Sequence, residues 1–302
     1  HGIYDYHKDL KTLHVNCEKP RAYFVPFSNE EGARAGVREY SEYFKSLIGE
    51  WDFNFYKSVT DVPCPTGEVE FLEKLDVPMN WQHALGRNYD KIQYSNQEYP
   101  FPNNPPHVPR ENPAGLYSRS FTLTEEELSG KDIMLNFEGV DSCFYLYVND
   151  KFVAYSQVSH MTSEFNVTKL IRAGKNEIRV AVLKWCDGSY LEDQDKIRSS
   201  GIIREVYLLY RDPVHVRDIF IKTELDDSFK SGKIKAELEL TGKTAVEYTL
   251  YCPCGKALAS GSVEGDGHAD IAINVENAVL WSDESPALYD LVLKVGDEYI
   301  SQ

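Results

Sequence analysis

Three features that would point quickly to a class of function are missing from this sequence of 302 residues. It has no basic run: 32 lysine and arginine residues stand against 48 aspartate and glutamate residues, and the formal net charge is −16. A chain of this charge repels a phosphate backbone and an anionic lipid surface, so we expect neither nucleic acid nor a membrane as a partner. No apolar stretch approaches the length of a membrane span, and residues 1–9 hold no apolar signal core.

The cysteines lack the spacing of a metal site. No C-x-x-C pair and no Cys/His cluster suitable for zinc occurs. Two of the cysteines, Cys143 and Cys186, lie in apolar strand contexts, which is typical of small core residues. We therefore expect reduced thiols in a cytoplasmic protein. The six cysteines are Cys17, Cys64, Cys143, Cys186, Cys252 and Cys254.

Apolar and aromatic residues, in contrast, are plentiful. Hydrophobic residues make up 42% of the chain and aromatic residues 13%, and the length suits about two domains, each with its own core. An acidic protein rich in tyrosine and tryptophan suits neutral polyhydroxylated ligands. Sugar hydroxyls bond to carboxylates, and the apolar faces of sugar rings stack on aromatic rings.

The first two parts of the chain differ in their residue patterns. Residues 1–37 show no sustained period and are predicted to form an N-terminal arm along a surface made by the rest of the chain. Over residues 38–211, short segments with two-residue alternation follow one another, separated by turn signals such as Asn149-Asp150 and Gly174-Lys175. This spacing predicts an antiparallel β-sandwich of jelly-roll type over residues 38–211.

A third part begins at Asp212-Pro213, which interrupts the pattern. The shorter set of strand-like segments that follows predicts an immunoglobulin-like β-sandwich over residues 212–302. Its last segment, residues 298–302, stops in mid-pattern, so we expect this domain to be truncated at its last strand. The predicted fold class is therefore all-β, with two sandwiches in series.

Residues 94–109 form a long segment with five prolines. Proline removes backbone donors, so this segment cannot be a central strand or a helix and must cross the surface in extended turns. Polar side chains on a stiffened loop lose little entropy on binding, which suits a ligand-contacting loop. A plain linker fits the composition equally well.

The most distinctive stretch is residues 185–195, Trp-Cys-Asp-Gly-Ser-Tyr-Leu-Glu-Asp-Gln-Asp, directly after an apolar segment. In an extended chain, Asp193 and Asp195 would point to the same side, about 6.6 Å apart. Inverting glycosidases separate their two carboxyl groups by about 6.5–9.5 Å and retaining ones by about 5–5.5 Å. The spacing permits a catalytic pair. A solvated acidic loop, or a loop that binds a cation or sugar hydroxyls, is the more common interpretation of such a run.

Six stretches of the chain resemble the N-terminal half of bacterial glycoside hydrolase family 2 β-galactosidases, in the order in which that family has them. The string Gly-Ser-Tyr-Leu-Glu-Asp-Gln-Asp, residues 188–195, is the most specific. The resemblance covers nearly the whole chain. The stretches are residues 111–118, 137–142, 174–176, 185–195, 200–206 and 280–289.

The resemblance implies a jelly-roll sugar-binding domain, an immunoglobulin-like domain and, in the parent enzyme, a third domain that is a (β/α)8 barrel. That barrel carries the acid/base and nucleophile glutamates of a retaining mechanism, so Asp193 and Asp195 are not the catalytic pair. The resemblance thus implies a non-catalytic part of a cytoplasmic, homo-oligomeric β-galactosidase. On its own the chain is expected to be inactive, and it supplies one wall of the galactose subsite and a docking surface for the barrel.

Site residues also follow from the resemblance. Asp195 matches an aspartate that binds galactose hydroxyls and helps to hold Na⁺, while Asn96 and Gln97 match loop residues that contact the galactosyl group. Asp187, Gln157 and Asp9 match positions around a structural Mg²⁺, a hard cation that prefers such oxygen ligands. The arm departs from the family pattern, with Thr12 near the position of a further ligand. Na⁺ and Mg²⁺ are thus implied for the parent enzyme, and the chain alone need bind neither.

Three alternatives stay open at this point. The chain could be a freestanding carbohydrate-binding module, or part of a family 2 β-glucuronidase or β-mannosidase, or a scaffold that self-associates through an exposed face. Trp51, Trp81, Trp185 and Tyr190 are candidates for sugar-stacking platforms, although the periodicity around Trp51 and Trp185 favours a place in the core.

Overall fold

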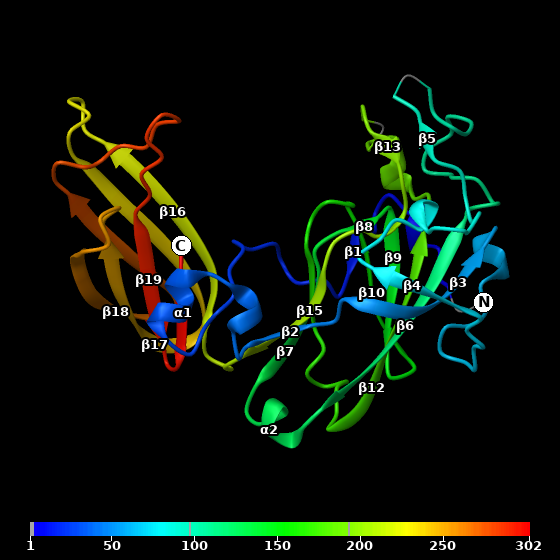
Figure 1. Ribbon diagram of the computed structural model, residues 1–302, viewed down its shortest axis with the longest axis horizontal. Helices are drawn as coiled ribbons and strands as arrows, with labels where there is room; N and C mark the ends of the chain where they lie inside the picture. Colours follow the sequence, from blue (N-terminus) through cyan, green and yellow to red (C-terminus); the bar gives the residue numbers. More distant parts are fainter. Residues whose placement is uncertain (1–2, 97, 193) are drawn as a thin grey trace. The chain divides into compact units, whose positions relative to one another are not determined.

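The computed structural model describes residues 3–96, 98–192 and 194–302. The chain forms two compact units. The first contains residues 1–20, 46–129 and 133–208, and the second contains residues 21–45, 130–132 and 209–302. Strands dominate both units (Figure 1), so the all-β fold class predicted from the sequence is confirmed. Within the described residues, none of the helices has the length and apolar character needed to cross a membrane.

A seven-stranded antiparallel sheet is the main element of the first unit. Of its middle strands, Cys143–Val148 is buried at every residue, as expected for a strand that is covered on both faces. Gly174–Leu183 is buried at every residue only from Val180 to Leu183. The longest ladder pairs β12 with β6 from Gly174↔Leu123 to Leu183↔Ala114. The strand order is β1 (His14–Val15), β10 (Lys151–Gln157), β9 (Cys143–Val148), β12 (Gly174–Leu183), β6 (Ala114–Leu123), β3 (Gly49–Tyr56) and β4 (Glu73–Val77).

Smaller sheets complete the jelly-roll region. A four-stranded sheet has the order β11 (Ser163–Asn166), β7 (Asp132–Phe137), β15 (Val206–Arg211) and β2 (Phe44–Ser46). Two short ladders pair β13 (Ile197–Arg198) with β5 (Gln93–Tyr94), and β14 (Gly201–Ile202) with β8 (Val140–Asp141). The helical pieces are short: η1 (Tyr6–Lys8), α1 (Glu30–Ala35), η2 (Arg38–Tyr40), η3 (Val59–Asp61), η4 (Trp81–His83), α2 (Glu125–Leu128) and η5 (Asp187–Tyr190).

The segment expected as an arm is shared between the two units. Its first part adds β1 to the edge strand β10 and packs Tyr6 against an apolar cluster that contains Tyr145 and Tyr155. Its second part belongs to the other unit, where Phe27 and Tyr299 exchange two backbone hydrogen bonds of 2.8 Å. Within the described residues, this segment thus pairs with a strand of the first unit at residues 14–15 and with Tyr299 of the second unit at Phe27.

The second unit is built on two long, paired strands, β17 (Gly232–Tyr251) and β18 (Ala257–Val275). The first half of β17 also pairs with β16 (Val216–Leu225), and its second half pairs with β19 (Asp290–Val295), which in turn pairs with β20 (Glu298–Ser301). All five strands belong to one sheet, and the pairing of β17 with β18 shifts register between Glu239 and Lys243. The buried core of this unit is mainly aliphatic, and the arrangement is the predicted immunoglobulin-like sandwich.

The expectation of six reduced thiols is wrong at one place. Cys252 and Cys254 form a disulfide across the turn that follows β17, because a C-x-C segment in a tight turn brings its two side chains together. Cys17, Cys64, Cys143 and Cys186 are free. Cys143 and Cys186 are buried, as expected of small core residues.

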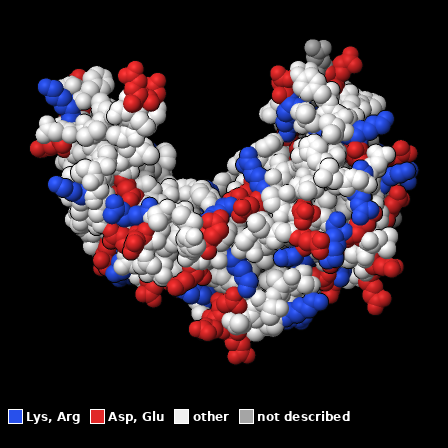
Figure 2. Space-filling model, viewed as in Figure 1, with Lys and Arg blue, Asp and Glu red and all other residues white. Residues whose placement is uncertain are grey.

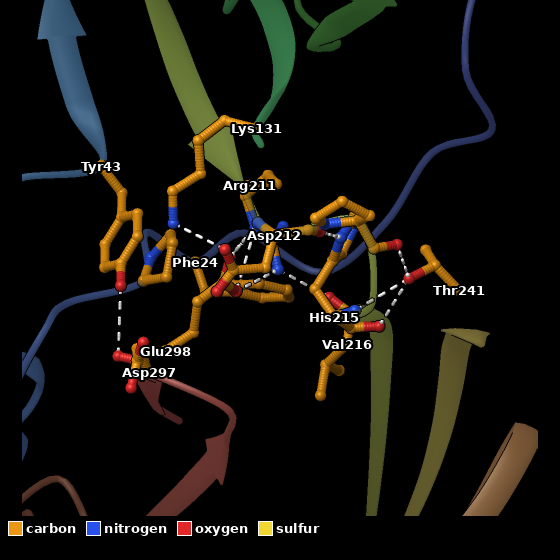
Figure 3. A network of polar contacts seen from close by, with 12 residues as sticks. Phe24, Tyr43, Lys131, Arg211, Asp212, His215, Val216, Thr241, Asp297 and Glu298 are labelled. Atoms are coloured by element: carbon orange, nitrogen blue, oxygen red, sulfur yellow. Dashed lines mark hydrogen bonds and ion pairs between the residues drawn. The ribbon is translucent and has the colours of Figure 1, made fainter. Parts of the chain in front are cut away.

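A buried ion pair lies at the centre of the polar network in Figure 3. Arg211 Nη2 is 2.9 Å from Glu298 Oε2, and the same nitrogen donates to the Val216 carbonyl at 2.9 Å. Glu298 also accepts the backbone N–H of Asp212 at 2.9 Å. Burial and the charge of Arg211 lower the pKa of His215 to about 4, so this ring stays neutral at pH 7 beside the pair.

Glu298→Gln is expected to lower the free energy of unfolding by about 3 kcal/mol, because it leaves the Arg211 guanidinium buried without a counter-charge. Urea unfolding followed by circular dichroism measures the change. The control is Glu237→Gln, which breaks the exposed pair with Lys222 and should change stability by less than about 1 kcal/mol. Equal effects of the two substitutions would contradict the importance given to the buried pair.

Candidate functional site

A buried asparagine fixes the point where the chain leaves the main sheet. Asn112 Nδ2 donates to the Trp185 carbonyl at 2.8 Å, and the Trp185 N–H donates to Asn112 Oδ1 at 2.9 Å. Asn112 is completely buried, so these two bonds have no competition from water. The acidic stretch that follows Trp185 therefore starts from a rigid position.

The proline-rich loop is held against this stretch by Tyr190. The Tyr190 hydroxyl donates to the His107 carbonyl at 2.6 Å and accepts the backbone N–H of Asn104 at 3.2 Å. The Tyr99 hydroxyl donates to the Tyr190 carbonyl at 2.7 Å, and the Phe101 ring meets the Tyr190 ring edge to face at 5.4 Å. The loop is thus packed onto the acidic stretch, which a plain linker would not be.

Two of the residues predicted to contact the sugar lie side by side. Because Ile197 pairs with Tyr94 in the β13–β5 ladder, the residues beside these strands come together (Figure 1). Asn96 Nδ2 donates to Asp195 Oδ1 at 3.3 Å, and the Tyr94 hydroxyl donates to the same oxygen. This contact joins residues 99 positions apart in the sequence. Gln97, predicted as a third contact, lies outside the described residues; so does Asp193.

Sequence reasoning missed two supports of this contact. Tyr94, which is mostly exposed, bonds to Asp195, and this hydrogen bond raises the pKa of the Tyr94 hydroxyl. Lys184 is buried below β5, and its Nζ lies 2.5 Å from Asp90 Oδ2 and 2.8 Å from Gln93 Oε1. The position of Lys184 one residue before Trp185, at the end of an apolar strand, was the available signal, because a lysine there needs a buried partner.

The residues predicted around Mg²⁺ also come together. Asp187 is buried, and its Oδ1 accepts from Gln157 Nε2 at 3.0 Å and from the Gly188 N–H at 3.0 Å. Gln157 Nε2 also lies 3.4 Å from the Thr12 carbonyl, and the Thr12 hydroxyl donates to Asp9 Oδ2 at 2.7 Å. Burial is the main reason why the pKa of Asp187 is raised, and the charge of Asp9 adds to the rise.

This oxygen-rich group suits a hard cation. Two carboxylates, an amide and a hydroxyl are ligands of the kind that Mg²⁺ takes, usually with several waters. A cation would also relieve the unfavourable burial of Asp187. Gln157 would have to turn its amide over to present an oxygen, because its nitrogen now faces Asp187. Among the residues that the structure describes, no three His, Cys, Asp or Glu side chains gather as a metal site.

The four aromatic candidates for sugar stacking are all core residues. Trp51, Trp81, Trp185 and Tyr190 expose 0, 1, 6 and 9% of their surface. A ring this deeply buried has no free face for a sugar, so the stacking interpretation is wrong for all four.

Tyr190→Phe should loosen the proline-rich loop while leaving the aromatic packing in place. Losing the hydroxyl removes its contacts with three backbone groups of the loop, those of Pro102, Asn104 and His107, so we expect about 1–2 kcal/mol less stability and faster amide hydrogen exchange in residues 99–107. Tyr40→Phe, at an exposed tyrosine, is the control and should change neither quantity. Unaltered exchange in Tyr190→Phe would mean that the loop is held by other contacts.

Two family models match the chain. One is described as "Glycosyl hydrolases family 2, sugar binding domain" and matches residues 44–213. The other is described as "Glycosyl hydrolases family 2" and matches residues 214–301. The boundary between the two matches falls between Pro213 and Val214.

Curated relatives are similar over nearly the whole chain. A β-galactosidase of Actinobacillus pleuropneumoniae is 46% identical over 299 residues, which is 99% of this chain. A β-galactosidase of Staphylococcus xylosus is 40% identical over 98% of this chain. The chain spans 29% of the length of each of these relatives.

Solved structures share the fold at lower sequence identity. A β-glucuronidase of Bifidobacterium dentium in complex with coumarin-3-O-glucuronide has a TM-score of 0.66 and is 17% identical, covering 84% of this chain and 45% of that one. A β-glucuronidase of an uncultured Clostridium has a TM-score of 0.64 and is 20% identical, covering 85% of this chain and 43% of that one. These likenesses bear on the fold alone.

Proposed function

The chain belongs to glycoside hydrolase family 2, and from that premise we propose that it is the sugar-binding and immunoglobulin-like part of a retaining β-galactosidase. In this proposal a (β/α)8 barrel elsewhere in the parent enzyme carries the two catalytic glutamates. The present chain supplies one wall of the galactose subsite and has no turnover of its own.

The observation that carries the proposal is the meeting of Asn96 and Asp195. A carboxylate accepts hydrogen bonds from sugar hydroxyls, and an amide both donates and accepts, so the pair suits neighbouring hydroxyls of one ring. Both side chains lie in an exposed part of the first unit. A wall of this kind leaves most of a monosaccharide in water, whereas useful affinity needs most of the ligand covered. The remaining walls must then come from the barrel.

A neutral sugar fits this wall better than a uronic acid. The Asp195 carboxylate would repel the carboxylate of a glucuronide, in a chain whose net charge is already −16. The relatives at 46 and 40% identity are β-galactosidases, whereas the β-glucuronidases named above are at most 20% identical. Both points favour the galactoside over the glucuronide alternative.

Two cations belong to the proposal. Asp195 would take part in a Na⁺ site that is completed outside this chain, and Asp187, Gln157 and Asp9 would surround Mg²⁺. A bound cation would offset the burial of the Asp187 carboxylate, which is the main cause of its raised pKa. We also propose that the parent enzyme is a cytoplasmic homo-oligomer.

The barrel would dock beside the acidic stretch. Leu191 is 88% exposed and Ile197 is 51% exposed, on either side of Asp195, and Tyr94 is 60% exposed on the neighbouring strand. Large apolar side chains in such a group usually mark an interface. On the face shown in Figure 2, acidic and basic side chains are interspersed, and among the described residues of that face no continuous basic patch forms.

Asp195→Asn in the parent enzyme should lower kcat/KM for a chromogenic β-galactoside by about 100-fold, because it removes an acceptor for sugar hydroxyls and a Na⁺ ligand. Asn96→Ala should have a smaller effect in the same direction. Asn103→Ala, an exposed asparagine of the same loop, is the control. The isolated chain should show no turnover. Turnover by the isolated chain, abolished by Asp195→Asn, would make the acidic loop itself catalytic and overturn the proposal.

Galactose titrated into the isolated chain separates this proposal from a freestanding carbohydrate-binding module. We expect no binding tighter than about 1 mM in calorimetry, because a single wall covers too little of the sugar. Millimolar or tighter binding that is lost in Asp195→Ala would favour the module.

Mg²⁺ should raise the melting temperature of the chain at pH 7, and Asp187→Asn should abolish the rise, because ligand binding to the folded state stabilises it. The rise should fade as the pH drops, since the raised pKa of Asp187 means that this carboxyl takes up a proton at a higher pH than usual and then ceases to bind metal. Asp150→Asn, at an exposed aspartate, is the control. A rise that survives in Asp187→Asn would place the metal elsewhere.

A further inference from the structure

A buried carboxylate lies below the acidic stretch and has no part in the site described so far. Asp141 ends the short strand β8, where it pairs with Gly201 of β14, and it is almost completely buried. Its Oδ1 is 3.3 Å from the Ser159 hydroxyl, and its Oδ2 is 3.6 Å from Lys196 Nζ. Asp141 thus touches the residue that directly follows Asp195.

Ser159 extends this contact to the other side of Asp195. Its N–H donates to Glu192 Oε1 at 3.0 Å, and its hydroxyl donates to Glu192 Oε2 at 2.8 Å. Ser159 is itself completely buried, in the turn that follows β10. The acidic loop is therefore fastened at Glu192, three residues before Asp195, and at Lys196, one residue after it.

Keeping Asp141 ionised works against the stability of the chain. Burial raises its pKa to about 6, and the charge of Glu192 adds to the rise, while Lys196 and Arg198 oppose it. A carboxyl with a raised folded-state pKa stabilises the fold while it is protonated, and that contribution is lost as the pH rises from about 4 to about 6. A group that lowers stability at neutral pH, beside a candidate site, has the features expected of a functional residue.

We propose that Asp141 is a positioning residue, which holds the acidic loop through its ion pair with Lys196 on one side while Ser159 holds Glu192 on the other, so that Asp195 faces the sugar. The functional part of this inference rests on the proposed function. The structural part, a loop held in place by Asp141, can be tested on the chain alone.

The first experiment compares Asp141→Asn with the wild-type chain at pH 7. We expect the melting temperature to stay the same or to rise, because the buried charge is gone. We expect amide hydrogen exchange in residues 192–196 to become faster by about fivefold or more, with β9 and β12 unchanged. Ser159→Ala should speed up the same segment from its other anchor, and Asp150→Asn, an exposed aspartate, is the control.

Two results would overturn the inference. A lower melting temperature with faster exchange throughout the unit would mean that Asp141 is only a structural residue. Unchanged exchange in residues 192–196 in Asp141→Asn would mean that Asp141 does not hold the loop, whatever the effect of Ser159→Ala.

The second experiment measures galactoside hydrolysis by the parent enzyme. Asp141→Asn should raise KM about tenfold and raise the Na⁺ concentration for half-maximal activity, while kcat stays within about threefold, because the loop binds but does not react. A large fall in kcat with an unchanged KM would contradict a positioning role for Asp141. If the wild-type parent does not hydrolyse β-galactosides, the proposed function fails, and the exchange result still decides whether Asp141 holds the loop.

Discussion

The paired hydrogen bonds between Asn112 and the Trp185 backbone are the constraint on which the rest of the site depends. An antiparallel sheet holds its strands firmly, but a chain that leaves a sheet loses its backbone partners and has to find new ones. Here the completely buried side-chain amide of Asn112 bonds to both the N–H and the carbonyl group of Trp185. Because the exit point is fixed, the eleven residues from Trp185 to Asp195 start from the sheet instead of from a flexible end.

The polar site is then held together by hydrogen bonds from side chains of one segment to groups of a neighbouring segment. Tyr190 bonds to the carbonyl and N–H groups of the proline-rich loop, Lys184 holds the strand before Asn96, and Glu192 bonds to Ser159. Each support is a buried or half-buried polar group with a partner, which is how an exposed loop reaches the precision of a rigid element. Asp195 itself needs little further support, because Glu192 before it and Lys196 after it are both held by buried partners.

Sequence reasoning could find the strands but not these supports. Two-residue alternation predicted the all-β fold because alternation is a direct consequence of strand geometry. The roles of Asn96 and Asp195 came from resemblance, since no local pattern links residues so far apart. Asp141 stands in a run that resembles any buried strand, and its partners Ser159 and Lys196 are distant in sequence. The wrong expectation about the cysteines has the same origin, because composition says nothing about the turn at residues 252–254.

In the region of the acidic loop, the aromatic rings are mostly buried or half-buried and the Asp195 carboxylate lies at the surface. The tryptophans of the first unit and Tyr190 are buried, and Phe101 of the proline-rich loop packs on the Tyr190 ring, so the side chains left at the surface of this region are mainly charged and amide groups. Carboxylates that accept sugar hydroxyls must stay ionised, and ionised groups crowded on one loop repel each other. Lys196, which directly follows Asp195, points its ammonium to the buried Asp141 carboxylate, 3.6 Å away. The positive charge nearest to Asp195 in the sequence is therefore directed at Asp141, and the Asp195 carboxylate accepts from the Tyr94 hydroxyl and the Asn96 amide instead.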